Sequence, residues 1–396
     1  MSTTAMLKKK NKLEILNVLK RAEKISKPDM AKNTRLTLAS VGSFINELLR
    51  QGLVTEEGCF DSQGGRKAVA YRFNKDRYYI IGIDMESNRI TAGIYNLSGE
   101  LSGELVQIGS PSVLSVEETL SRMIQTIQAL LTVFDREKII GIGIGVPGKV
   151  DTRNGMIIKL TNLVNWVNIP LKDIIERETG IPVYVERDTN ATLSCLKWFT
   201  VTGGHSNVVY AGIGDGIGGG ILIDNKVFHG SHGVAGEIGH ISMDVHGAAC
   251  NCGNRGCIEV IASENAIIRK VEAGLKEAGI PLERPLTIMD VIRLVKEENG
   301  IARAVLAEAS KYIAIWLVNI IHSYGPSLIV LECRWLRELD EFFNGVVSDI
   351  YENTRLADRR EISILMNPVE DAARKGSAMI VIERLFHDVE DNRLLE

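Results

Sequence analysis

Four potential metal ligands lie close together in the second half of the chain. They are His240, Cys250, Cys252 and Cys257. Zinc binds thiolate and imidazole groups in a tetrahedron, and four protein ligands without an open position are typical of structural rather than catalytic zinc. Gly253 and Gly256 allow the tight turns that three converging thiolates require, because glycine tolerates positive φ. The alternative is three buried cysteines that are close by coincidence, and the spacing favours the zinc site.

Two glutamates bracket this cluster, Glu237 before the histidine and Glu259 after the last cysteine. A bound zinc would hold the loops that carry both carboxylates. The whole pattern, E-x-G-H followed by C-x-C-G-x-x-G-C-x-E, resembles the signature of the ROK family (repressor, open reading frame, kinase). The resemblance implies a structural Zn²⁺ and a sugar site beside it. It also implies an actin-like, sugar-kinase-type α/β fold of two lobes.

The length and composition indicate a soluble protein of several domains. A chain of 396 residues is longer than one core usually covers. With 45% hydrophobic and 24% charged residues, its composition is that of a globular protein. We expect no apolar run of membrane-spanning length and no secretory signal, hence a cytoplasmic location. The three remaining cysteines are scattered and indicate no disulfide framework.

Charge is distributed unevenly along the chain. Residues 1–77 contain sixteen lysines and arginines against eight acidic residues, a net of +8, whereas the remainder has thirty against forty-two, a net of −12. A basic N-terminal region on an otherwise acidic chain suggests that this region binds a polyanion. A charge excess alone is often only a solvated face, so a motif is needed as well.

Residues 13–52 have the pattern of three short helices. A helical period over 13–19 is followed by a second helix with Ser26 as N-cap and Pro28 in its first turn, running to about residue 33. Thr37 caps a third helix, which Gly52 ends. The expected inward positions of that helix are Val41, Phe44 or Ile45, Leu48 and Leu49. Two helices joined by a short turn predict a helix-turn-helix.

Two strand-like runs, 53–56 and 68–73, follow the third helix and surround a polar loop. This predicts a winged helix-turn-helix with Arg66 and Lys67 in the wing, where they would reach phosphate or a narrow minor groove. The alternative is an exposed hairpin whose charges keep an edge soluble. Residues 26–73 also resemble the DNA-binding domain of ROK repressors, including its G-G-R loop.

One departure from that resemblance concerns the third helix, which lacks the basic residues often found there. Base contacts would then come from hydroxyl and amide groups, which are weaker than an arginine to guanine pair. The predicted DNA-binding residues are Thr37, Ser40, Ser43, Asn46, Arg66 and Lys67.

Alternating strand and helix patterns after residue 76 predict α/β lobes. Strands are expected at 79–84, 89–96 and 138–145, a helix at 117–135 and a long apolar core helix at 302–321. We expect a winged domain over residues 1–75 and a sugar-sensing domain over 76–396. The latter would divide into lobes at about 78–190, joined by the C-terminal helix, and about 191–375.

Three elements that would face ATP in a ROK kinase are altered. Where family kinases carry an Asp-x-Gly-Gly-Thr loop, residues 84–88 lack both glycines, and Glu86 places a negative charge where phosphate should approach. The glycine-rich loop 212–220 has Asp215 where threonine is common, and Glu332 stands in place of a late Gly-Gly. The resemblance therefore implies a degraded ATP site and no catalytic residue.

The sugar side of the resemblance is better preserved. Residues 186–191 match the family's Asn-Asp-x-Asn-Ala motif, with Asp188 at the position of the kinases' general base and Arg187 in place of asparagine. Without ATP, Asp188 would accept a hydrogen bond from a sugar, the alternative being a structural salt bridge. Asn162 and Trp166 match a segment near the sugar cleft. The predicted sugar-binding residues are Asn162, Asp188, Glu237, His240 and Glu259.

Three functions are considered. The basic winged region and the missing phosphate-loop glycines both favour the first. It is a sugar-responsive transcriptional repressor of carbohydrate-metabolism genes, which xylose, glucose or N-acetylglucosamine would fit equally well. The second is a ROK sugar kinase that phosphorylates a hexose, and the third is a bifunctional regulator. The partners expected for the first are an operator duplex, a monosaccharide and a second copy, as a homodimer or dimer of dimers.

Overall fold

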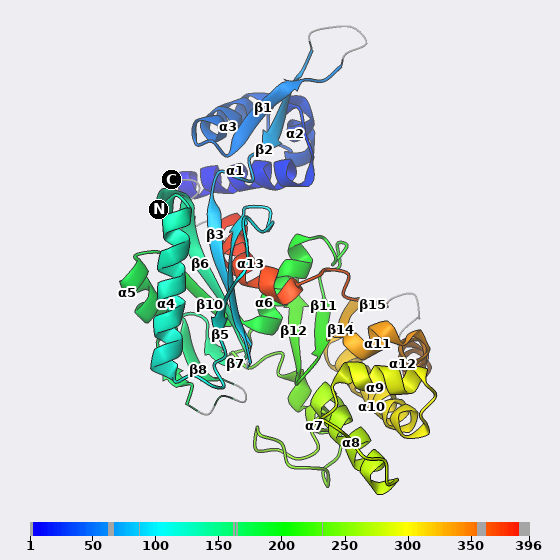
Figure 1. Ribbon diagram of the computed structural model, residues 1–396. Coiled ribbons are helices and arrows are strands. Elements are labelled where there is room, and N and C mark those ends of the chain that lie inside the picture. Colours follow the sequence, from blue (N-terminus) through cyan, green and yellow to red (C-terminus); the bar gives the residue numbers. More distant parts are fainter. Residues whose placement is uncertain are drawn as a thin grey trace. The chain divides into compact units, whose positions relative to one another are not determined.

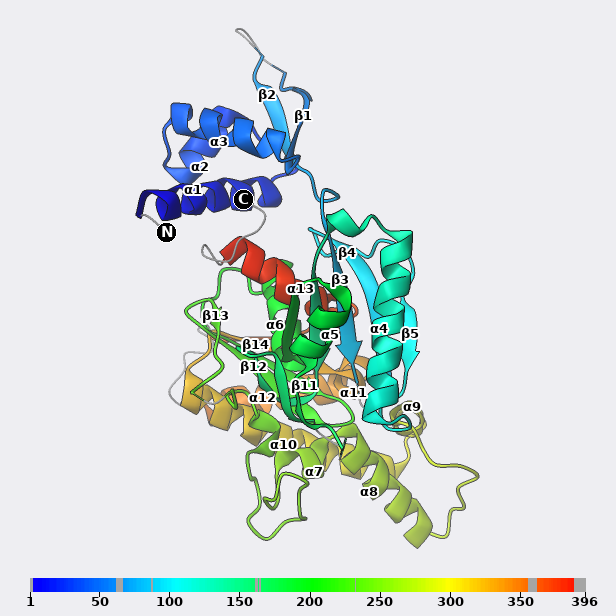
Figure 2. The same ribbon diagram turned by 90° about the vertical axis from the view of Figure 1, so that its left-hand side faces the viewer.

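The computed structural model describes residues 3–61, 67–86, 88–160, 163, 165–231, 233–354 and 362–387. The chain divides into two compact units. The first comprises residues 1–194 together with 373–396, and the second comprises residues 195–372. Figures 1 and 2 show their helices and strands from two sides.

The first unit opens with three helices and a hairpin (Figure 1). These are α1 (Thr3–Arg21), α2 (Lys27–Thr34), α3 (Leu38–Arg50) and the antiparallel strands β1 (Val54–Cys59) and β2 (Val69–Phe73). Both predicted caps are present, because the hydroxyl of Ser26 accepts from the amide of Asp29 at 3.3 Å and that of Thr37 from Ser40 at 3.2 Å. Four predicted inward positions of α3 are buried, whereas Leu49 is half-buried. The winged helix-turn-helix prediction is therefore confirmed as a fold.

Part of the basic charge of this region is used internally, which the residue count did not anticipate. Lys12 and Lys8 of α1 form ion pairs of 2.6 and 2.8 Å with Glu47 of α3. These contacts lower the pKa of the Glu47 carboxyl, Lys12 contributing most. The pairs join α1 to α3 and leave the net charge of +8 unchanged, because that count already includes Glu47.

The rest of the first unit is built on a five-stranded sheet in the order β10-β6-β3-β4-β5. The strands are β3 (Tyr79–Met85), β4 (Ile90–Asn96), β5 (Val106–Gly109), β6 (Ile139–Val146) and β10 (Val183–Arg187). Neighbours β3, β6 and β10 are parallel, and β3, β4 and β5 are antiparallel. The isoleucines of β3 and β6 pack under α4 (Val116–Val133) and α5 (Leu171–Thr179). A small sheet of β7 (Gly148–Asp151), β8 (Met156–Leu160) and β9 (Val167–Ile169) extends this core.

The opposite face of that sheet carries α13 (Ala372–His387), at the end of the described chain. Alternation along a strand places Gly82 and Gly143 on this face. A Cβ at Gly143 would lie 1.9 Å from the backbone oxygen of Ser377, and one at Gly82 would lie 2.7 Å from its hydroxyl. The glycines therefore allow the backbone of α13 to lie directly against the strands.

The far end of α13 contacts the winged region. The rings of Phe386 and Phe73 meet edge to face with centroids 5.9 Å apart, and the Lys20 ammonium lies 5.9 Å from the Phe386 ring. The segment that joins β2 to β3 is held by hydrogen bonds on both sides. Its Lys75 carbonyl accepts from the amide of Leu97 in the β4–β5 turn, and the Arg77 guanidinium donates to the carbonyl of Gln51.

The second unit repeats the strand arrangement of the first, with a sheet in the order β13-β12-β11-β14-β15. The strands are β11 (Val208–Ile213), β12 (Ile217–Ile223), β13 (Lys226–Val227), β14 (Leu328–Cys333) and β15 (Ser363–Met366). In both sheets the first three strands form an antiparallel meander, and the fourth and fifth add in parallel beside the first. This duplication confirms the predicted two-lobed, sugar-kinase-type α/β fold.

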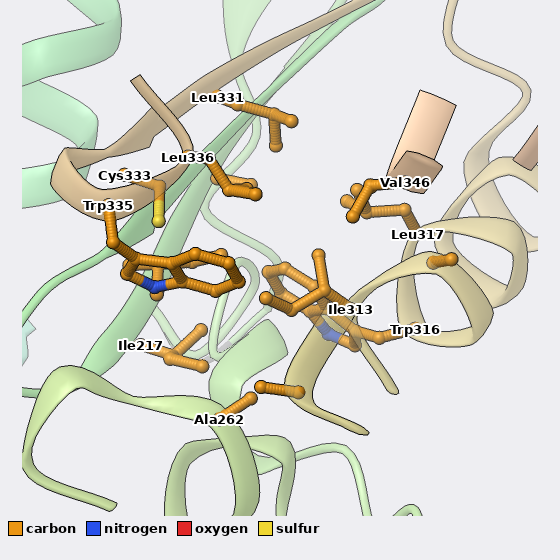
Figure 3. Close-up of a cluster of buried hydrophobic side chains, with 14 of the residues drawn as sticks. Ile217, Ala262, Ile313, Trp316, Leu317, Leu331, Cys333, Trp335, Leu336 and Val346 are labelled. Carbon is orange, nitrogen blue, oxygen red and sulfur yellow. The ribbon is translucent and has the colours of Figure 1, made fainter. Parts of the chain in front are cut away.

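Helices complete the second unit, and Figure 3 shows their core. They are α7 (Ile258–Ala262), α8 (Glu264–Glu277), α9 (Ile288–Lys296), α10 (Gly300–Tyr324), α11 (Arg334–Glu338) and α12 (Asp340–Asn353). The fully buried indoles of Trp316 and Trp335 face the same cluster of aliphatic side chains. Contrary to our expectation, α10 is long and apolar enough to cross a membrane by length and composition. Eleven of its residues are buried in the protein, which confirms its prediction as a core helix.

Candidate functional site

The four predicted metal ligands converge in the second unit. The ligand atoms of His240, Cys250, Cys252 and Cys257 all lie within 4.8 Å of one another. The Cys252 and Cys257 sulfurs are 3.7 Å apart, and the Cys250 sulfur is 3.6 Å from Nδ1 of His240. Tetrahedral zinc with bonds of about 2.3 Å to sulfur requires sulfurs about 3.8 Å apart, so the ligand set fits this ion. Burial raises the pKa of the Cys257 thiol to about 12, so a cation that binds here displaces its proton.

Backbone packing brings these ligands together. Gly256 has φ +59, and a Cβ there would lie 1.8 Å from the carbonyl oxygen of Asp244. Gly239, beside the histidine, packs as closely on β12, since its Cβ would lie 1.8 Å from the oxygen of Ile217. Both glycines are therefore required by close approach. The indole of Trp316 in α10 donates to the carbonyl of Ile238 at 2.9 Å, which fixes the histidine turn to the core.

The two predicted glutamates lie on elements adjoining the cysteine cluster. An Oε2 of Glu237 is 3.7 Å from Nε2 of His240, whose other ring nitrogen faces Cys250. A carboxylate on the outer nitrogen orients a metal-binding imidazole. Glu259, in the first turn of α7, accepts the amide of Ile217 at 3.0 Å. Glu259 thus supports the glycine-rich β11–β12 turn, a role that the sequence did not indicate.

In the first unit, Asp188 begins α6 (Asp188–Trp198) just after the end of β10. Its Oδ1 accepts the amide of Thr189 at 2.7 Å, and the side chain is half-buried. Asp84, at the end of β3, lies on the same part of the sheet. A Cβ at Gly145, between the two strands, would be 3.8 Å from both Oδ1 of Asp84 and Cα of Asp188.

Asp84 is a further residue of this site. From the sequence it was considered only as the first residue of the segment 84–88, which lacks the glycines of a phosphate loop. It is 3% exposed, and its Oδ2 has no hydrogen-bond partner among the described residues. Burial, with repulsion from Glu86 and Asp188, raises the pKa of Asp84 to about 7, against the attraction of Arg374 and Arg89. The signal available in the sequence was its position at the end of a parallel strand, where ligands bind in α/β sheets.

Two expectations about the segment 161–166 have different outcomes. Asn162 lies outside the described residues. Trp166 is 2% exposed and belongs to the hydrophobic core under α4 and α5. Trp166 is therefore a core side chain, and the sequence match near a sugar cleft does not by itself indicate contact with a ligand.

The altered nucleotide elements have specific internal contacts. Glu86 is tied to Arg89 by a 2.6 Å ion pair that closes the turn after β3. In the second unit, Oε2 of Glu332 accepts from the Tyr210 hydroxyl at 2.8 Å and from the Asn367 amide at 2.9 Å. That hydroxyl would lie 2.8 Å from a Cβ at Gly212. The Tyr210 side chain thus lies over Gly212 and is held there by Glu332.

The predicted DNA-contacting residues lie on α3 and near the wing. Thr37, Ser43 and Asn46 are exposed, and Ser40 is half-buried. Lys67 is largely exposed, with its ammonium 3.9 Å from Asp61, a separation that provides little stabilisation at a surface. Arg66 lies outside the described residues. Ser43 and Asn46 are thus exposed on α3, whereas the hydroxyls of Thr37 and Ser40 lie 2.9 Å apart and share a hydrogen bond.

Comparison with known proteins places this architecture among both regulators and kinases. A ROK family model matches residues 80–383. The xylose repressor of Caldicellulosiruptor bescii is 32% identical over 386 residues, 94% of this chain and 95% of the repressor. The glucokinase of Thermotoga maritima is 28% identical over 321 residues, 77% of this chain and 98% of the enzyme. A solved ROK family transcriptional regulator, described as a homolog of the E. coli MLC protein, has a TM-score of 0.83 at 24% identity, covering 96% of this chain and 97% of that chain.

Proposed function

The chain belongs to the ROK family, and from this premise we propose that it is a sugar-responsive, DNA-binding transcriptional repressor. The observation that carries the proposal is the extent of similarity. The match to a named xylose repressor runs through nearly the whole chain, whereas the match to a glucokinase covers 77% of it. The part of the fold that precedes residue 80 is a winged helix-turn-helix, an arrangement that inserts a helix into the major groove.

In this proposal residues 1–75 bind operator DNA and residues 76–396 bind the effector. The protein would act in the cytoplasm as a homodimer or dimer of dimers, because helix-turn-helix proteins read paired half-sites. The operator would belong to carbohydrate-metabolism genes. D-xylose is the first effector to test, given the names of the relatives.

The effector is a monosaccharide held by carboxylates. Asp188, Glu237 and Glu259 accept hydrogen bonds when ionised, and such acceptors select a sugar by its hydroxyl pattern. His240 and Asn162 complete the proposed set. The Glu259 carboxylate already accepts one backbone amide, so only its remaining acceptor sites are available to a hydroxyl.

The proposed cofactor is one structural zinc ion, held by His240, Cys250, Cys252 and Cys257. A zinc ion held by these four residues would link the turn at Ile238–His240 to the loop before α7. Glu237 precedes this turn directly, and Glu259 lies in the first turn of α7. The four protein residues would therefore position both carboxylates together.

Several contacts argue against phosphoryl transfer as the main activity. The Glu86–Arg89 pair and the Tyr210–Glu332–Asn367 hydrogen bonds occupy positions that a kinase would leave to nucleotide. The ligand would act instead through its differential affinity for two arrangements of the protein, since only this difference can shift DNA binding.

The proposal is tested with the purified full-length chain and DNA from the region upstream of its own gene. Binding is measured while xylose, glucose, N-acetylglucosamine and their phosphates are added, with ATP hydrolysis recorded in parallel. Sugar-dependent release without ATP turnover supports the repressor. Sugar-dependent ATP hydrolysis without DNA binding would establish the kinase instead.

A further inference from the structure

The outward surface of α3 is apolar at the end where a recognition helix enters the groove. Its first residue, Leu38, is 55% exposed, and its neighbour Ala39 is exposed as well. The only charged residues of α3 are Glu47 and Arg50, and Glu47 forms ion pairs with two lysines of α1. The N-terminal half of α3 therefore carries no charge, and its exposed side chains are those of Leu38, Ala39 and Ser43.

The same side of α3 carries a glycine. A Cβ placed on Gly42, one turn after Leu38, would meet no described atom within 4 Å. Gly42 thus adds no side chain to this side of α3, and open space lies beside it. A groove wall can approach this side of α3 more closely than a helix face lined with long side chains would allow.

Two exposed cations lie on the segments that precede α3. Lys32 of α2 has a side chain that is 81% exposed, and its ammonium is 3.9 Å from Asp29. Arg35, exposed in the turn between α2 and α3, has φ 56. This charge fits a partner whose exterior is phosphate and whose interior offers apolar edges. Duplex DNA has both, because thymine places its C5-methyl group in the major groove.

We propose that Leu38, with Ala39 beside it, packs against thymine C5-methyl groups in the major groove, so that the operator half-site is read at its thymines by apolar contact. The inference rests on the proposed function, namely that the winged region binds operator DNA. Lys32 and Arg35 then contribute phosphate contacts, which position the helix without reading sequence.

Uracil substitution tests this contact because it removes only the methyl group. The full-length chain first selects its preferred duplex from a randomised pool. Affinity is then compared between that duplex and copies in which thymines of one half-site are replaced by uracil. For the natural sequence we expect about a fourfold loss per contacted methyl group.

Leu38→Ala supplies the second arm. It should weaken binding to the thymine duplex and lose sensitivity to uracil at the contacted position. Leu7→Ala is the matched control, since Leu7 in α1 is 58% exposed, and it should bind like the natural chain. Circular dichroism and thermal unfolding verify that both variants are folded.

Three results would overturn the inference in distinguishable ways. If uracil has no effect on the natural chain, or if Leu38→Ala remains as sensitive to uracil, thymine methyl contact by Leu38 is wrong while the DNA-binding function stands. If the natural chain binds no duplex in the selection, the proposed function fails and this inference fails with it.

Discussion

Replacing Asp84 with asparagine should stabilise the first unit at neutral pH. The carboxyl is buried on the face of the sheet that carries α13, with one oxygen lacking a hydrogen-bond partner among the described residues. Burial and the charges of Glu86 and Asp188 raise its pKa from 3.8 to about 7. Asparagine has nearly the same shape and no charge, so the substitution removes the cost of burying the carboxylate.

The sign and size of the effect follow from proton linkage. As pH rises from about 4 to about 7, the unfolded chain releases the Asp84 proton before the folded chain does, so the folded state loses stability and does not recover it at higher pH. A displacement of about three pKa units is equivalent to about 4 kcal/mol. About 3 kcal/mol of this loss falls between about pH 5 and about pH 8.

Urea unfolding of the natural chain and of Asp84→Asn, measured across that range, provides the comparison. Hydrogen exchange of amides in β3 and β6 locates the opening in the first unit. We expect the stability difference between the two proteins to grow with pH by about 3 kcal/mol. Glu86→Gln should move the change to lower pH, because it removes one repelling charge. Parallel stability curves would refute the reasoning and indicate that Arg374 compensates an ionised Asp84.

Three other substitutions test the metal site, the sugar site and the packing of α13 against the sheet of the first unit. Cys257→Ser should lose bound zinc and the DNA response to sugar before it loses secondary structure, and a variant that kept both would contradict the zinc assignment. Glu259→Gln should weaken sugar binding by about tenfold to a hundredfold in calorimetry with zinc content unchanged, as expected for a charged hydrogen bond; unaltered affinity would exclude Glu259 from the site. Gly143→Ala should destabilise the first unit by about 1–3 kcal/mol in urea, because its methyl group overlaps the Ser377 backbone. The control Gly345→Ala, in open space on α12, should not destabilise.

The sequence predicted best those features that depend on neighbouring residues. The zinc ligands lie within one short segment, so their spacing alone indicated their convergence. The boundaries of α2 and α3 were marked by Ser26 and Thr37, whose side chains cap these helices through local hydrogen bonds.

Features that depend on distant pairing were missed or misjudged. Asp84 meets Asp188 only because β3, β6 and β10 align in register, which periodicity does not specify. The pairing of Lys12 with Glu47 joins two helices that are separate in the sequence. Trp166 matched a family segment, yet its burial is decided by helices from other parts of the chain. Arg66 and Asn162 lie outside the described residues and remain predictions.

The late position of α13 in the chain has a consequence for biosynthesis. A ribosome completes the strands of the first unit long before it makes residues 372–387, yet Gly82 and Gly143 need that helix to cover them. The same helix supplies Phe386, which packs on Phe73 at the edge of the winged region. Chains that end early therefore keep an uncovered glycine face and an unsupported DNA-binding region. We therefore expect truncated chains to be less stable and more readily degraded than the full-length chain.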